Sequence, residues 1–295
     1  MREIQPDIVH VHASALARLV LAGPLLLAAT PRGAIRLLTI HSGSFVDRYR
    51  SASGFSRWVL RRLFASFDRV VTVNEEQKAT LVAEGIDGDR IRVVPAFLPP
   101  TQQPGGASGT VQALKERRGW AVVSSGYALP YYGFHTIVDA VASLPEAQRP
   151  GLVLAFYNQY DEAYVASLKL AIEDAGLDAI LLRDLPPEVF AGVLAAGAVY
   201  VRATDRDGDA VAIREAGYLG LQVLATDCVR RPDGCALFPT HSVPDLATLL
   251  ARASSDTELG RLRAGESDPI SDMYGDFLRL SPHQDVTLTP SISAS

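Results

Sequence analysis

Short apolar and β-branched segments recur along this sequence, and helical patterns fill the intervals between them. The first four such segments are DIVHVH (7–12), IRLLTIH (35–41), DRVVTV (68–73) and IRVVPA (91–96). Six more follow: WAVVSS (120–125), LVLAFY (152–157), AILLRD (179–184), AVYVRAT (198–204), LQVLAT (221–226) and CALFP (235–239). Strands that alternate with helices form parallel sheets, so this rhythm predicts an α/β protein.

A turn-rich stretch, LPPTQQPGGASGT (98–110), interrupts the rhythm and divides the chain. We therefore expect two Rossmann-like, doubly wound domains: residues 1–103, a linker at 104–118, residues 119–265, and a C-terminal helix with a disordered tail at 266–295. The first domain is expected to be incomplete, because a strand begins near residue 7 with no glycine-rich turn before it. A start codon assigned too far downstream, a degraded gene copy and a protein that works without this segment are the open alternatives.

The composition narrows the class of protein and its partners. Of the 295 residues, 48% are apolar and 21% are charged, as in a soluble globular protein of two domains. A net charge of −5 argues against a nucleic-acid partner. The longest apolar stretch, LVLAGPLLLAA (19–29), is too short to span a bilayer. Cys228 and Cys235 indicate no disulfide scaffold, so a reducing cytoplasm is the predicted location.

The stretch RATDRDGDAVAIREAGYLG (202–220) crowds charged residues into a turn and then becomes apolar. It predicts a strand, a tight polar loop and a helix, with Asp209 as the N-cap and Gly220 as the residue that ends the helix. Ligands collect where such loops leave the carboxyl ends of parallel strands, and helix N-termini attract phosphate. Taken singly, Asp209 is more often a cap and Glu215 more often a solvated residue. The motif as a whole favours a ligand site.

The aspartates of this loop are anions, so a phosphate group there needs cations nearby. Arg202, Arg206 and Arg214 are available for that role. Glu215, further along the predicted helix, can accept hydrogen bonds from the hydroxyl groups of a ligand. A nucleotide-sugar carries both phosphate and hydroxyl groups, and we expect it to be the ligand.

Several blocks of the chain together resemble the retaining glycosyltransferases of family 4, which have the GT-B fold of two Rossmann-like domains. The blocks are TIHSG (39–43), DRVVTVNEEQKATLVAEGIDGDRIRVVPAFLPP (68–100), YYGFHTIVDAVA (131–142), VRATDRDGDAVAIREA (201–216) and VLATDCVRRPDG (223–234). The family signature is a Glu, seven intervening residues and a second Glu. Here Asp207 stands at the first position and Glu215 at the second. The resemblance covers residues 7 to about 280, and its blocks at 131–142, 201–216 and 223–234 are similar to a subgroup associated with polysaccharide assembly.

The resemblance implies roles for individual residues. Asp207 would face the donor sugar and Glu215 would hold the ribose hydroxyl groups, while His41 would reach toward the donor sugar and the reacting centre. The expected catalytic residues are thus Asp207 and His41. The expected donor-binding residues are Gly126, Arg202, Arg206, Gly208, Asp209, Ala210, Val211, Arg214 and Glu215, with backbone N–H groups around Asp209, Ala210 and Val211 at the sugar or the pyrophosphate.

One loop departs from the family pattern. Many relatives place an Arg and a Lys in the first loop of the second domain, where this chain has SSGYALPYYG (124–133). Gly126 keeps the close-approach glycine, but Tyr127 and Tyr132 stand where the cations are expected. We therefore expect Arg202, Arg206 or Arg214 to meet the phosphate charge.

The resemblance implies an enzyme that transfers a sugar, of the hexosyl type, from a nucleoside diphosphate sugar to a glycan or lipid-linked acceptor in polysaccharide biosynthesis. The anomeric configuration would be retained, and no cofactor or metal would be required. Two alternatives stay open. Asp207-Gly208-Asp209 can instead be a metal-binding acid pair, and the chain can be a non-catalytic, nucleotide-sugar-binding remnant of such an enzyme.

The segment RYRSASGFSRWVLRRLF (48–64) alternates arginines with large apolar residues. A basic amphipathic helix of this kind can lie on anionic lipid, so peripheral contact with the inner face of the membrane is one hypothesis. The alternative is a solvated helix that buries Trp58 in the core.

Overall fold

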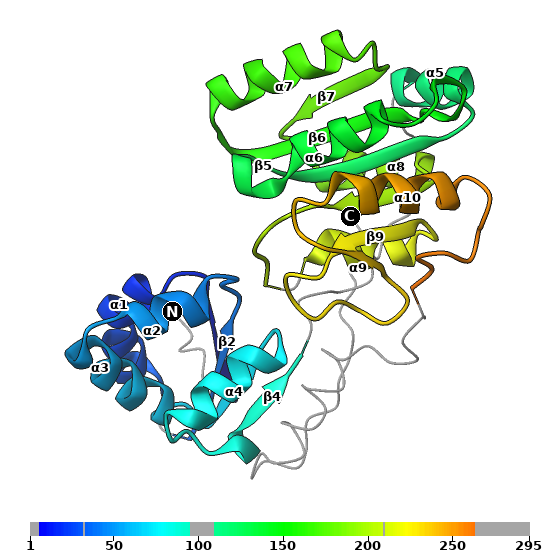
Figure 1. The fold of residues 1–295 in the computed structure, drawn as a ribbon. Coiled ribbons are helices and arrows are strands. Elements are labelled where there is room, and N and C mark those ends of the chain that lie inside the picture. Colours follow the sequence, from blue (N-terminus) through cyan, green and yellow to red (C-terminus); the bar gives the residue numbers. More distant parts are fainter. Residues whose placement is uncertain (1–5, 32, 95–108, 209, 263–295) are drawn as a thin grey trace. The chain divides into compact units, whose positions relative to one another are not determined.

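A computed structural model describes residues 6–31, 33–94, 109–208 and 210–262. These residues form two compact units (Figure 1), which we call the amino-terminal unit, up to Val94, and the carboxyl-terminal unit, from Gly109 to Leu262. Each unit is built around a parallel sheet of its own. The predicted α/β class is therefore confirmed.

The amino-terminal unit contains four parallel strands in the order β1-β2-β3-β4. The strands are β1 (Ile8–Ala13), β2 (Ile35–Ile40), β3 (Arg69–Thr72) and β4 (Ile91–Val93), and the helices are α1 (Leu16–Ala29), α2 (Phe45–Ser51), α3 (Gly54–Ala65) and α4 (Glu75–Ala83). The described strands succeed one another in one direction across the sheet.

A buried apolar cluster joins this sheet to its helices. Leu38 and Ile40 of β2 pack with Phe45 of α2 and Phe64 of α3, all of them almost fully buried. Helix α1 crosses α3 closely at Gly23, because a Cβ at that position would lie 2.7 Å from the Leu63 side chain. This close packing fixes α1 and α3 side by side (Figure 1).

The carboxyl-terminal unit contains six parallel strands in the order β10-β9-β8-β5-β6-β7. They are β5 (Ala121–Ala128), β6 (Gly151–Tyr160), β7 (Ala179–Arg183), β8 (Val199–Arg202), β9 (Gln222–Thr226) and β10 (Ala236–Phe238). The sheet is wound outward from β5 in one direction and from β8 in the other. The two strands are neighbours, with Val122 opposite Val199, so the winding reverses between them. In open α/β sheets this reversal point is where ligands bind, at the carboxyl ends of the strands.

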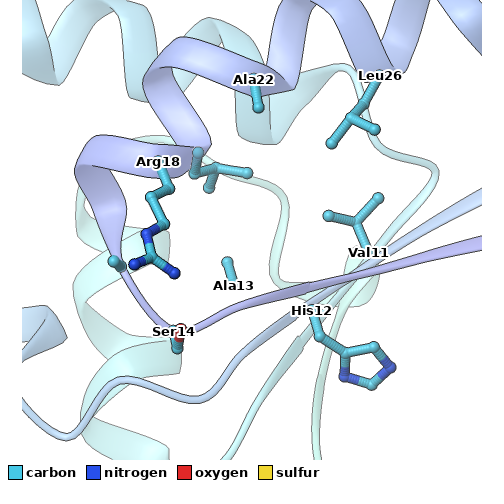
Figure 2. A pocket seen from close by; sticks show the side chains of 9 residues that line it. Val11, His12, Ala13, Ser14, Arg18, Ala22 and Leu26 are labelled. Carbon is cyan, nitrogen blue, oxygen red and sulfur yellow. The ribbon is translucent and has the colours of Figure 1, made fainter.

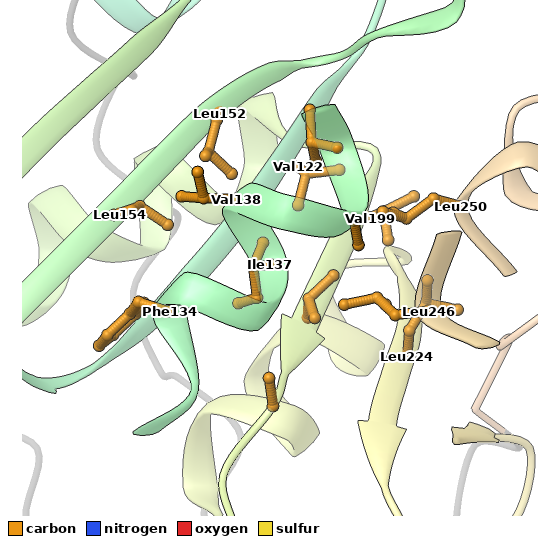
Figure 3. Close-up of a cluster of buried hydrophobic side chains, with 14 of the residues drawn as sticks. Val122, Phe134, Ile137, Val138, Leu152, Leu154, Val199, Leu224, Leu246 and Leu250 are labelled. Atoms are coloured by element: carbon orange, nitrogen blue, oxygen red, sulfur yellow. The ribbon is translucent and has the colours of Figure 1, made fainter. Parts of the chain in front are cut away.

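Helices cover both faces of this sheet, as a doubly wound fold requires. The helices are α5 (Gly109–Arg118), α6 (Phe134–Ala142), α7 (Glu162–Asp174), α8 (Pro187–Ala196), α9 (Val211–Tyr218) and α10 (Val243–Ala253). Helices α6, α7 and α10 pack on one face, where Ile137 and Leu246 meet Val122 and Val199 (Figure 3). Helices α5, α8 and α9 pack on the other, against alternate residues of the same strands.

The predicted linker at 104–118 is wrong in its second part. Residues 109–118 form α5, which buries Val111 and Leu114 against the sheet. Gly151 lets this helix approach, because a Cβ there would lie only 2.5 Å from the Leu114 side chain. The rest of the predicted linker, 104–108, and the predicted tail, 266–295, lie outside the described residues.

Candidate functional site

The polar loop after β8 connects a strand to a helix, as the sequence predicted, and the strand order places it at the reversal point of the sheet. Parallel strands end at the same edge, so this loop, residues 203–210, lies beside the ends of β5 and β9. Thr204 fixes the loop to both neighbours: its Oγ1 lies 3.0 Å from the carbonyl oxygen of Tyr131, and its carbonyl oxygen accepts a 2.6 Å hydrogen bond from Thr226 Oγ1. The loop is therefore held from two sides.

Asp207 is bound by two arginines, and we call Arg202, Asp207 and Arg231 the buried ionic triad. Arg202 Nε and Nη2 donate to Oδ2 and Oδ1 of Asp207 at 3.0 and 3.2 Å. Arg231 Nη1 donates to Oδ2 at 2.8 Å. The backbone N–H of Gly208 donates to Oδ1 at 3.0 Å. The carboxylate thus accepts hydrogen bonds on both oxygens.

The triad also ties the ends of three strands together. Arg202 Nη1 donates to the Ser125 carbonyl oxygen of β5 at 3.0 Å. Arg231 Nε donates to the Thr226 carbonyl oxygen of β9 at 2.9 Å. Only 10% of the Arg202 side chain, 9% of the Asp207 side chain and 2% of the Arg231 side chain are exposed. The loop between β8 and α9 is thereby locked to the strands on either side of it.

The charges of the triad stabilise one another. Burial alone would raise the pKa of Asp207, but the positive charges of Arg202 and Arg231 and the hydrogen bonds they donate lower it below its ordinary value. Burial opposes the charge on Arg202, yet the Asp207 carboxylate raises the pKa of that guanidinium. All three groups are charged at neutral pH.

The structure gives two of the predicted site residues partners within the protein, and their roles toward the donor stay predictions. Arg202 was expected to meet phosphate, but its guanidinium is buried and engaged with Asp207 and Ser125. Asp207 was expected to face the donor sugar, whereas its two oxygens face two guanidinium groups. The alternative of a metal-binding acid pair fits poorly as well, because a metal ion would have to displace both arginines from that carboxylate.

Three tyrosines occupy the loop where relatives carry cations. The Tyr132 ring lies against Gly126, where any Cβ would overlap it, so the close approach at this glycine is made by Tyr132. The Arg202 guanidinium lies 4.8 Å from the centre of the Tyr132 ring. Burial raises the pKa of Tyr132 to about 12, so this side chain is neutral. Tyr127 packs beside it, with ring centres 5.3 Å apart.

Arg206 is the exposed cation of the loop. Its guanidinium lies 4.6 Å from the centre of the Tyr131 ring, a cation–π geometry that keeps the side chain near the loop. Arg214, on α9, is half-buried. Of the three predicted phosphate-binding arginines, Arg206 is therefore the one with an exposed charge beside the loop.

Helix α9 begins slightly later than predicted. Its N-cap position is Ala210, without a side-chain cap, so the prediction of Asp209 as N-cap is wrong in position; Asp209 itself lies outside the described residues. Gly208 and Ala210 are buried, and Val211, the first helical residue, is 39% exposed. Gly220 follows the helix with φ at +79°, the left-handed conformation expected of a helix-ending glycine.

Glu215 lies on α9, half-buried, and burial raises the pKa of its carboxyl group. Tyr157, in the second half of β6, packs in the same apolar cluster as Ile213 and Ala216 of α9. After burial and the nearby Tyr200, the charge of Glu215 is a further cause that raises the pKa of Tyr157. The Tyr157 hydroxyl is buried and has no hydrogen-bond partner among the described residues.

In the amino-terminal unit, three histidines form a row on adjacent strands. His12 and His41 are hydrogen-bonded through Nδ1 and Nε2 at 2.7 Å, and His10 Nε2 lies 2.6 Å from Thr39 Oγ1. The ring centres of His10 and His12 are 4.1 Å apart. Burial, and then the charges of the other two rings, lowers the pKa of His10 to about 4. Burial and His12 also lower the pKa of His41.

The loop after His41 is fixed by a buried glutamine. Gln77 Nε2 donates to the Ser42 carbonyl oxygen at 2.9 Å, and Gln77 Oε1 accepts from the Val73 N–H at 3.2 Å. Asn74 caps α4 and accepts from the Gln77 N–H. Helix α4 thereby sets the position of His41. The predicted reach of His41 toward the donor concerns the arrangement of the two units and stays a prediction.

A cavity of about 180 Å³ lies between β1 and α1. Figure 2 shows Val11, Ala22 and Leu26 around it, with Arg18 beside Ser14 at one end. The His12 ring points to the other side of the strand, as expected for successive residues of a strand. The lining of the cavity combines apolar side chains of β1 and α1 with the polar residues His12, Ser14 and Arg18.

The basic segment 48–64 forms α2 and α3 rather than one helix. The alternative that buries Trp58 is wrong, because Trp58 is 53% exposed. Phe55 is 74% exposed, and its ring stacks on that of Trp58. The Arg62 guanidinium lies 5.7 Å from the Trp58 ring. No helix within the described ranges has the length and apolar character needed to cross a bilayer.

Four residues of these sites were missed in the sequence. Arg231 was visible only as part of an arginine pair after the strand that precedes it, and Tyr131, Tyr157 and His12 carried no distinct pattern. A strand-end position at the carboxyl edge is the signal they share. Using it requires knowledge of which strands are neighbours.

Comparisons with known proteins point in one direction. Residues 1–102 match the family model described as Glycosyltransferase Family 4. No curated protein matches the sequence significantly. HepE from Anabaena, solved with UDP and glucose, has a TM-score of 0.65 at 17% identity, over 90% of this chain and 73% of that one. Sucrose-phosphate synthase from Thermosynechococcus elongatus has a TM-score of 0.69 at 16% identity, over 93% and 74%.

A third solved structure, of E. coli trehalose-6-phosphate bound with UDP-2-fluoro glucose, has a TM-score of 0.68 at 11% identity, over 88% of this chain and 67% of that one. At such identities, the likeness shows the fold alone. That fold is GT-B, with two Rossmann-like domains, as the sequence predicted.

Proposed function

We propose that this chain transfers a sugar from a nucleoside diphosphate sugar to a glycan or lipid-linked acceptor, in keeping with the match of residues 1–102 to the model of Glycosyltransferase Family 4 and with the GT-B fold. The observation that carries the proposal is the locked loop at the reversal point of the carboxyl-terminal sheet. A loop held in this way is organised before a ligand arrives, which is what electrostatic stabilisation of a transition state requires.

The donor binds in the carboxyl-terminal unit. Arg206 provides the exposed cation beside the loop, and the backbone N–H groups of Ala210 and Val211, with that of the predicted Asp209, meet the diphosphate or the sugar. Glu215 accepts hydrogen bonds from the ribose hydroxyl groups. Its half-buried position supports this, because a partly desolvated carboxylate gains more from a hydrogen bond than a solvated one.

Transfer places negative charge on the leaving diphosphate as the glycosidic bond to it breaks. The positive groups around the loop after β8 stabilise that charge, and no metal is required for this step. The sugar is of the hexosyl type and its anomeric configuration is retained, in line with the Asp207 and Glu215 spacing of the family signature. Asp207 takes part by holding Arg202 and the loop, in keeping with its two ion pairs.

The acceptor is bound by the amino-terminal unit, and His41 faces the reacting centre. Support comes from the fixed loop that carries His41 and from the ring of His12, which orients it. A role in polysaccharide biosynthesis accords with an acceptor held near the cytoplasmic face of a membrane. The exposed Phe55 and Trp58, with the arginines of α3, form the surface that rests on anionic lipid.

Calorimetry and a turnover assay test the proposal together. The full chain is titrated with UDP, GDP and ADP, beginning with UDP because HepE was solved with it. Consumption of the matching nucleotide-sugar is then measured with a crude lipid-linked acceptor. Binding with turnover supports the transferase, and binding without turnover supports the alternative, a nucleotide-sugar-binding remnant. Affinity no better than about millimolar for every nucleotide, which is the weak end of ligand affinity, contradicts both.

A further inference from the structure

The buried ionic triad carries a net positive charge. Two guanidinium groups share one carboxylate, so Arg202, Asp207 and Arg231 together have a net charge of +1. The group is almost wholly removed from water, as the exposed fractions of 10%, 9% and 2% show. Burying a net charge costs free energy unless a group of opposite charge lies nearby.

The triad lies where an anion is expected. It is directly attached to Gly208 of the loop before α9, and to Ser125 near the end of β5, at the reversal point of the sheet. The loop after β5 supplies no cation, since Tyr127 and Tyr132 stand there and Tyr132 is neutral. The loop after β5 thus lacks a positive charge, and the buried ionic triad supplies one beside the neighbouring loop between β8 and α9.

We propose that the buried ionic triad is the fixed positive charge of the donor site and stabilises the diphosphate through the loop, without touching it. Arg231 is the positioning residue that adds the second positive charge and holds Asp207 against Arg202. The inference rests on the proposed donor binding in this unit. Because the triad is screened from solvent, its effect is long-range and resists added salt, unlike that of an exposed arginine.

Two variants test the net charge of the triad. Arg231→Gln makes it 0, and Arg231→Lys keeps it at +1. Arg230→Gln is the matched control, since Arg230 is the adjacent arginine and is exposed. Each variant is titrated with UDP and with uridine, and circular dichroism with thermal melting shows that it is folded at the titration temperature.

The expected result is a UDP affinity that rises with the net charge of the triad. Arg231→Gln weakens UDP binding roughly tenfold, as for a unit charge removed at ~12 Å with an effective dielectric constant of ~20. Arg231→Lys restores most of the affinity. Uridine, which has no phosphate, binds equally to all variants. Arg230→Gln changes UDP affinity only at low salt.

Two results overturn the inference alone: equal UDP affinity across the folded variants, or equal loss of UDP and uridine affinity, which marks a purely structural lock. If Arg231→Gln does not fold, Arg231→Lys decides the matter, because it keeps the net charge and a tenfold loss of UDP affinity in this variant contradicts a charge effect. Failure of the wild type to bind any nucleoside diphosphate overturns the proposed function itself.

Discussion

His12 Nδ1 and His41 Nε2 form a 2.7 Å hydrogen bond across 29 residues of sequence. One ring must donate and the other must accept, so the bond is lost when both are protonated. His10 stacks on the same row, and its pKa is lowered to about 4 by burial and then by the charges of His12 and His41.

The folded chain therefore binds fewer protons here than the unfolded chain between about pH 6.5 and pH 4. We expect the free energy of unfolding to be greatest above pH 6.5 and to fall as the pH drops through this window. Melting temperatures across the window measure it. The fall in melting temperature with decreasing pH should be shallower in His12→Gln than in the wild type. It should be the same as in the wild type in His135→Gln, because His135 lies in the other unit. Identical slopes in all three proteins contradict the coupling.

Glu215→Gln should weaken nucleotide binding by about 1.5–3 kcal/mol, the range for a hydrogen bond to a charged group. The amide keeps the shape of the side chain but loses the charge that attracts the ribose hydroxyl groups. Calorimetry with UDP measures the change. Glu188→Gln, an exposed residue of α8, is the control. Equal UDP affinity of Glu215→Gln and the wild type rejects the ribose role.

Tyr157→Phe and Tyr200→Phe form a matched pair in one sheet. Tyr200 is hydrogen-bonded to Ser125 at 2.9 Å, so removing its hydroxyl should lower the free energy of unfolding by about 1 kcal/mol. The Tyr157 hydroxyl is buried without such a partner among the described residues, so its removal should leave stability unchanged or raise it. Denaturant unfolding measures both. Equal destabilisation would show that the Tyr157 hydroxyl has a partner in solution.

Asp207→Asn should lower the free energy of unfolding by about 3–5 kcal/mol, because it leaves two buried guanidinium groups without a counter-charge. Asp178→Asn provides the contrast. Its carboxylate pairs with Arg118 at 2.6 Å but is 39% exposed, so the cost should stay within about 1 kcal/mol. Urea unfolding at pH 7 compares the two. A small and equal effect would mean that the triad does not hold the loop in solution.

The surface of α3 should bind anionic vesicles. Reversal of its charge by Arg57→Glu, Arg61→Glu and Arg62→Glu together should abolish co-sedimentation with phosphatidylserine vesicles. Phosphatidylcholine vesicles control for the apolar contribution of Phe55 and Trp58. Binding that resists both salt and the triple reversal argues against an electrostatic membrane contact.

The regular fold was accessible from the sequence. Each of the ten predicted strands is present within a few residues of its expected position, because buried parallel strands leave continuous apolar runs. Helix α5 was missed because a Pro/Gly-rich stretch precedes it and only Val111 and Leu114 mark its buried face. The cap at Asp209 was misplaced since helix ends depend on local geometry more than on residue type.

The position of the site along the chain could be predicted from the sequence, but the ion pairs within it could not. The loop at 203–210 and Glu215 followed from a strand–loop–helix pattern. The partner of Asp207, however, comes from 24 residues further on, and depends on β8 lying between β5 and β9. A linear motif does not show that two charged side chains five residues apart form an ion pair. Asp207 and Arg202 were therefore expected to contact a ligand.

The strand order also governs when the site can exist during folding. The triad draws on β5, on the loop after β8 and on Arg231 beyond β9, so its contacts have high sequence separation and close late. Cys228 lies beside these contacts, with its Sγ 3.4 Å from Arg231 Nη2, so its thiol is a probe of their formation. During synthesis on the ribosome, the loop between β8 and α9 therefore cannot be locked until the chain past residue 231 has emerged.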